Sequence, residues 1–175
     1  MDAQDIKAVA ALYLARPPER LVLEGYRHWT HGLSQRSPDR VEALATLYDA
    51  ALGPRDAGPV LSAFQDFICI AGLCARCPLR MMASGCVGLC RDEALILGIV
   101  SGLQHDDNEA TAVCLRAIAH PARADQMAFS AGAYAFLLRG RGLTLMPIPT
   151  GALEGVLSPN RHPDAAEMRS GTTLH

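Results

Sequence analysis

Residues 69–90 read CIAGLCARCPLRMMASGCVGLC and contain five of the six cysteines of the chain. The stretch lies between a predicted helix that begins near Pro59 and the most apolar segment of the protein, residues 94–103. It is therefore interpreted as a loop between two core helices. Its cysteines are arranged as Cys74-x2-Cys77-x8-Cys86-x3-Cys90, and Cys69 lies five residues before the first of them.

On both sides of this stretch, apolar residues recur at intervals of three and four, the spacing of an amphipathic helix. Helices are expected over residues 2–15, after the proline pair 17–18, from Ser37 to Gly53, and over residues 122–139 and 151–157. Ser37 and the proline after it are typical of a helix start, and a glycine is typical of a helix end. The stripes expected to face the core are Val22, Tyr26, Trp29 and Leu33; Val41, Leu44, Ala45, Tyr48 and Leu52; Val60, Leu61, Phe64, Phe67, Ile68 and Ala71; Ala110, Val113, Cys114, Ala117 and Ile118; and Phe129, Ala133, Phe136 and Leu137.

The segment after the cysteines begins with Asp92 and Glu93, whose charges complement the positive end of a helix dipole. Glu93 stands three residues after Cys90, the position of the acid in a capping box. Residues 94–103 are apolar nearly all round, and a buried strand is the competing interpretation. The acidic start and the length of the pattern favour a helix at the centre of the bundle.

These patterns predict an all-α fold, a single bundle of about six or seven helices with a cysteine-rich metal-binding loop. A length of 175 residues is enough for one hydrophobic core. The helical domain is expected to cover residues 1–157, and residues 158–175 are expected to form a polar tail.

The cysteine spacing is that of a metal site. Cys74 with Cys77, and Cys86 with Cys90, form two closely spaced pairs, and each pair can chelate one edge of a tetrahedral ion. Four thiolates suit zinc or an iron–sulfur cluster. Cys90 precedes a helix, where backbone amides and the helix dipole are expected to lower the pKa of its thiol.

The motif Cys69-Ile-Ala-Gly-Leu-Cys74-Ala-Arg-Cys77 resembles the C-x4-C-x2-C ligand loop of plant-type 2Fe–2S ferredoxins, including the central Ala-Gly. The resemblance covers nine residues. It implies that Cys69, Cys74 and Cys77 supply three ligands and that Cys86, Cys90 or Cys114 supplies the fourth.

Three functional hypotheses follow from the cysteines. The leading one is a small cytoplasmic bacterial regulatory or protein-interaction module in which Cys74, Cys77, Cys86 and Cys90 hold structural zinc. The alternative is an iron–sulfur protein for electron transfer or for sensing oxygen or redox state, with Cys69 as an additional ligand. The third is a set of unliganded thiols or a reversible disulfide.

The remaining candidate residues are expected to have structural roles instead of binding metal. Cys114 shares a face with Val113 and Ala117 and is expected in the core, and His120 is expected only to end a helix. His28 and His31 could bind a metal, but a solvated face is the favoured interpretation.

Composition excludes several classes of function. A net charge of −2 gives no field that attracts nucleic acid. Acidic residues at the start of the sequence do not suit a secretory signal, and the run at 94–103 is shorter than a membrane span, so a cytoplasmic location is expected. No catalytic motif is found, so an enzymatic role is not favoured. The expected partner is another protein, and the sequence does not define an oligomeric state.

Overall fold

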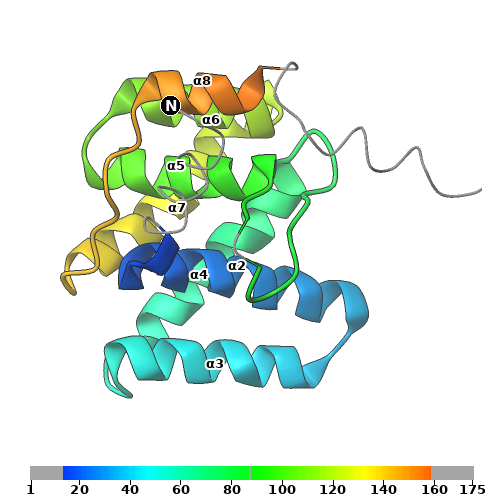
Figure 1. Cartoon of the computed structure of the whole chain (residues 1–175), viewed down its shortest axis with the longest axis vertical. Coiled ribbons are helices and arrows are strands. Elements are labelled where there is room, and N and C mark those ends of the chain that lie inside the picture. Colours follow the sequence, from blue (N-terminus) through cyan, green and yellow to red (C-terminus); the bar gives the residue numbers. More distant parts are fainter. Residues whose placement is uncertain (1–13, 87, 159–175) are drawn as a thin grey trace, which may run out of the picture.

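The computed structural model describes residues 14–86 and 88–158, and these residues form seven α-helices and one turn of 3-10 helix (Figure 1). The all-α prediction is confirmed for this part of the chain, and the helix expected at residues 2–15 and the tail expected at 158–175 lie almost entirely outside it. The elements are α2 Pro17–Gln35, α3 Pro38–Leu52, α4 Ala57–Cys74, α5 Arg91–Gln104, α6 Asn108–Ile118, η1 Pro121–Arg123, α7 Ala124–Arg139 and α8 Thr150–Leu157.

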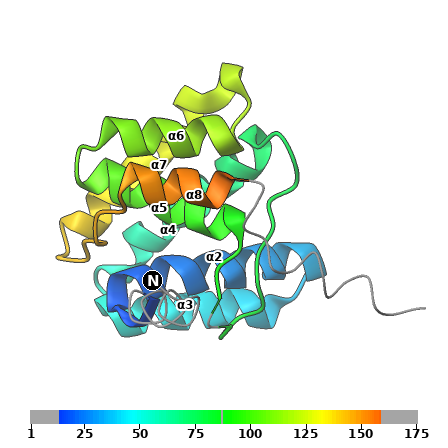
Figure 2. The same cartoon turned by 45° about the horizontal axis from the view of Figure 1, so that its top comes forward.

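Helix α5 lies at the centre of the bundle and packs against α2, α6, α7 and α8. Figures 1 and 2 show α6 and α8 on one side of it and α2 and α3 on the other. Nearly every residue of α5 is buried, as expected for a helix that is apolar all round. The helix interpretation of residues 94–103 is therefore confirmed, and the strand interpretation is wrong.

Three aromatic side chains join α3, α4 and α7 in the core. The ring of Phe64 lies 5.5 Å from that of Tyr48 and 5.2 Å from that of Tyr134, measured between centroids. The two tyrosine hydroxyls are 2.8 Å apart and share a hydrogen bond, so neither is buried without a partner.

Glycine at position 98 allows α5 to approach α6 and α8 closely. A Cβ atom at Gly98 would lie 2.6 Å from the sulfur of Cys114 and 2.9 Å from Cδ2 of Leu153, which is closer than such atoms pack. Cys114 is fully buried at this contact, which confirms its expected place in the core.

Helix α4 confirms its predicted apolar stripe but extends further than expected. Phe64, Phe67 and Ala71 are fully buried, and Cys69 is exposed on the outer face. The helix continues to Cys74, so the first residues of the cysteine-rich stretch are helical. The expectation that residues 69–74 belong to the loop is wrong, because the helix continues and Ala71 and Cys74 extend its buried stripe.

Helix α4 is also the one helix of the described residues that is long and apolar enough to cross a membrane, with a mean hydropathy of 1.5 over 18 residues. A core helix of a globular protein meets the same criterion of length and composition. The buried side of α4 faces α3 and α7.

The predicted inner face of α7 is wrong. Phe129 and Phe136 were expected in the core, yet they are 83% and 76% exposed. Met127, Tyr134 and Leu138 are fully buried instead. Helix α7 carries two apolar stripes, and the one that faces α4 and α5 includes the tyrosine whose hydroxyl finds a partner in the core.

The outer ends of the stripes predicted on α2 and α3 are also exposed. Leu33 and Val41 were expected to face the core, and they are 56% and 41% exposed. Both residues lie near the turn between the two helices, whereas Val22, Tyr26, Leu44 and Tyr48, which lie further from this turn on the same stripes, are buried.

Candidate functional site

The cysteines after α4 lie in the segment between α4 and α5, residues 75–90, which we call the α4–α5 loop. Its first residues pair with the end of α6: the backbone amide of Arg76 donates to the carbonyl of Ile118 at 3.0 Å, and that of His120 donates to the carbonyl of Cys74 at 2.7 Å. The loop then crosses α2 and turns back to enter α5 (Figure 2). It is therefore fixed at one end by α6 and along its length by α2.

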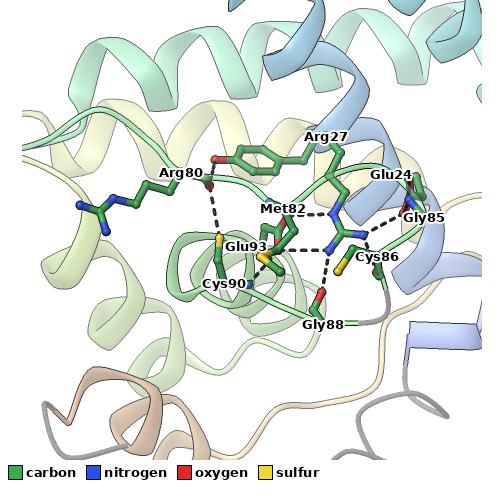
Figure 3. A network of polar contacts seen from close by, with 10 residues as sticks. Glu24, Arg27, Arg80, Met82, Gly85, Cys86, Gly88, Cys90 and Glu93 are labelled. Carbon is green, nitrogen blue, oxygen red and sulfur yellow. Dashed lines mark hydrogen bonds and ion pairs between the residues drawn. The ribbon is translucent and has the colours of Figure 1, made fainter. Parts of the chain in front are cut away.

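Arg27 on α2 is the centre of the contacts that hold the loop (Figure 3). Its side chain is fully buried, and it makes a two-point ion pair with Glu93 on α5, at 2.8 Å and 3.2 Å. Its remaining donors bind Glu24 and two loop carbonyls. The distances are 3.0 Å to the Glu24 carboxylate, 2.9 Å to the carbonyl of Cys86 and 2.7 Å to the carbonyl of Gly88.

Glu93 uses both carboxylate oxygens to hold the loop. Besides Arg27, it accepts the backbone amide of Met82 at 2.8 Å and that of Cys90 at 2.9 Å. The second of these bonds is the one expected of a capping-box acid, so this role of Glu93 is confirmed. The pairing with Arg27 was not predicted, because the two residues are 66 positions apart.

The Arg27 guanidinium stays charged in this buried position. Burial by itself disfavours the cation, but the hydrogen bond and the charge of Glu93 outweigh it and raise the pKa of Arg27 above its usual value. No local pattern in the sequence marks this residue, because Arg20, Glu24 and His31 lie on the same side of α2 as Arg27.

Arg80 fixes the middle of the loop through its backbone. Its carbonyl accepts the hydroxyl of Tyr26 at 2.8 Å, and its amide donates to the carboxylate of Asp92 at 2.9 Å. The thiol of Cys90 lies 3.4 Å from the same carbonyl. The side chain of Arg80 points away from this network (Figure 3).

A cleft of about 450 Å³ opens between the loop, the start of α5 and the end of α6. Cys77 and Cys90, which stand near the two ends of the loop, both line it, together with three arginines. Two of those arginines are tied to the wall, because Arg76 donates to the carbonyl of Ala119 at 2.8 Å and Arg91 donates to that of Ala117 at 3.0 Å. Asp92 lines the cleft as well and pairs with Arg91 at 3.1 Å, so the cleft combines two thiols with three arginines and one carboxylate.

The predicted ligands do not gather into one group. Cys69 is exposed on α4, and Cys74 is buried at the end of that helix with its sulfur 3.6 Å from Oε1 of Gln126. Cys86 is half-buried in the loop. In residues 14–86 and 88–158, no three histidine, cysteine, aspartate or glutamate side chains lie close enough to hold a metal ion. A four-cysteine site therefore does not fit the described arrangement, and metal ligation stays a prediction.

The expected low pKa of Cys90 is wrong. Burial raises the pKa of this thiol to about 11, and the nearby carboxylates of Glu93 and Asp92 add to the effect. The backbone amides at the start of α5 do lower it, as expected for a helix N-terminus, but burial is the larger influence. Cys90 is therefore a protonated thiol at neutral pH.

This pKa predicts slow alkylation of Cys90 by iodoacetamide. At pH 8 a pKa of about 11 leaves roughly one thiol in a thousand as thiolate, against roughly one in ten for an unperturbed thiol. The rate should rise about tenfold for each pH unit from 8 to 10, because only the thiolate reacts. Peptide mass spectrometry would follow it, with exposed Cys69 as the internal comparison and circular dichroism as a check that the fold persists. Labelling of Cys90 at a rate equal to that of Cys69 at pH 8 would contradict the prediction.

Comparison of this chain with protein-family models, with curated proteins and with solved structures found no match.

Proposed function

We propose that this chain is a small regulatory or protein-interaction module that binds zinc through the thiols of the α4–α5 loop. The observation that carries the proposal is that Cys77 and Cys90, from the two ends of the loop, line one cleft. Thiolate is a preferred ligand of zinc, and Cys86 lies in the same loop as a third thiol. Participation of Cys74 requires the end of α4 to move, because this side chain is buried.

Zinc in this position would regulate the protein and would not be required for folding. The loop is already attached to α2 and α5 by the buried pair of Arg27 and Glu93 and by its backbone bonds. Metal binding would therefore change the surface around the cleft without being needed to order the core. The arginine rim of the cleft suits a partner protein with an acidic surface.

An iron–sulfur cluster is the second candidate, and the position of Cys69 makes it the weaker one. The ferredoxin-like motif needs Cys69, Cys74 and Cys77 to converge on one cluster. Residues five apart in a helix point about 140° away from each other, and Cys69 is exposed where Cys74 is buried. Ligation by both would require the last turn of α4 to unwind.

Elemental analysis of the full chain, purified without oxygen, tests the proposal. We expect a colourless protein with about one zinc ion per chain, and loss of that zinc from Cys77→Ser and Cys90→Ser. Cys69→Ser is the matched control and should keep the metal. A zinc content that does not depend on Cys77 or Cys90 would contradict the proposal, and so would a metal-free protein that fails to take up added zinc. A brown protein with visible charge-transfer absorption would establish the iron–sulfur alternative in its place.

A further inference from the structure

The side of α7 that faces away from the core carries a regular stripe of its own. Phe129 and Phe136 stand one heptad apart on it, and both are largely exposed. The intervals along the stripe alternate between four and three residues, so its members lie within an arc of about 80°. We call this set the α7 outer stripe: Asp125, Phe129, Gly132, Phe136 and Arg139.

Gly132 stands at the middle of the stripe, and the packing of its own chain gives no reason for a glycine there. A Cβ atom added at this position would meet no other atom within 4 Å. Glycine inside a helix costs stability relative to alanine, because it loses more backbone freedom on folding. Gly58, Gly72, Gly151 and Gly155 are equally open, so the feature that distinguishes Gly132 is its position between two exposed phenylalanines. A missing side chain at that position would let another helix cross closely.

The charges at the two ends of the stripe define the direction of that second helix. Asp125 lies seven residues before Gly132, and Arg139 lies seven residues after it. Arg139 donates to the carbonyl of Gln104 at 2.9 Å and lies 3.7 Å from the carboxylate of Asp106, but its side chain remains 56% exposed. In the described part of the chain no ion pair involves Asp125.

We propose that a second copy of this chain docks on the α7 outer stripe, with the two α7 helices antiparallel and a two-fold axis beside Gly132. This arrangement places each Asp125 beside the second copy's Arg139 and each Phe129 beside the second copy's Phe136. A parallel arrangement would bring like charges together. The charges of the stripe are self-complementary only in the antiparallel direction, and self-complementarity is the requirement for a two-fold symmetric interface.

The mass of the full chain in solution, measured by light scattering after gel filtration over a range of concentrations, tests this interface. We expect a dimer of twice 18.7 kDa that dissociates on dilution. Asp125→Arg should raise the dissociation constant by about tenfold or more, because it places two arginines side by side. The charge exchange Asp125→Arg with Arg139→Asp should restore most of the affinity.

The variant Gly132→Leu distinguishes an effect on docking from an effect on folding. The open space around this position accepts the side chain, so the variant should keep its helix content and melt at the same or a higher temperature, yet remain a monomer. Gly151→Leu on α8 is the matched control, since its Cβ also meets open space, and it should dimerise normally. A wild-type chain that is monomeric at the highest concentration would overturn the proposal, as would a dimer that Gly132→Leu leaves intact.

Discussion

Arg27→Ala should lower the free energy of unfolding by about 3–5 kcal/mol, a loss typical of breaking a buried ion pair. The substitution removes a fully buried side chain and leaves the Glu93 carboxylate buried without its counter-charge. It also leaves the carbonyls of Cys86 and Gly88 without their donor. Urea unfolding followed by circular dichroism and by the fluorescence of Trp29, the single tryptophan, would measure the change.

A double-mutant cycle separates the energy of the ion pair from the packing energy that is lost when either side chain is shortened. Arg27→Met combined with Glu93→Leu should cost clearly less than the sum of the two single substitutions, because the double variant buries no lone charge. Arg27→Lys should fall between wild type and Arg27→Ala, since lysine keeps the charge but not the five-donor fork. Additive effects in the cycle would show that the loop is held by other contacts.

Phe64→Ala should cost about 3–5 kcal/mol, the loss typical of removing a buried aromatic ring. Its ring is fully buried between Tyr48 and Tyr134, so the substitution leaves a cavity where α3, α4 and α7 meet. Leu33→Ala is the control at an exposed position and should change the free energy of unfolding by no more than about 0.5 kcal/mol. The same denaturant titration measures both variants.

Similar losses in the free energy of unfolding for Phe64→Ala and Leu33→Ala would contradict the assignment of Phe64 to the core and of Leu33 to the surface. The comparison is informative because the sequence placed both residues on inward-facing stripes. Only the fold distinguishes the covered part of a stripe from the part that continues beyond the neighbouring helices.

The elements themselves were predictable because their signals are local. The buried stripe of α4 and the all-round apolar character of α5 follow from residue spacing, and both were confirmed. The capping bond of Glu93 was predictable for the same reason, since its partner Cys90 is three residues away. Cys114 was correctly assigned to the core from its neighbours on the helix face.

The candidate site was predictable only in part. The spacing of the cysteines located the loop, but it did not reveal that Cys74 ends a helix and is buried while Cys77 lines a cleft. The pKa of Cys90 was predicted in the wrong direction, because the dipole of α5 is a local effect and burial is not. The pair of Arg27 and Glu93 joins α2 to α5 and has no local pattern that defines it.

The sequence by itself determined the helices of the described residues, most of their starts and ends, and the presence of a cysteine loop between α4 and α5, although α4 ends later than expected, at Cys74. Spacing, capping and helix-breaking residues act within a few positions of the chain, so their effects can be predicted from the sequence without knowledge of the fold. The tertiary structure alone decided which stripe of α7 is buried, which thiols share a cleft, and that Arg27 and Glu93 hold the loop. These outcomes depend on which surfaces cover one another, and that is fixed only when segments distant in the chain pack together.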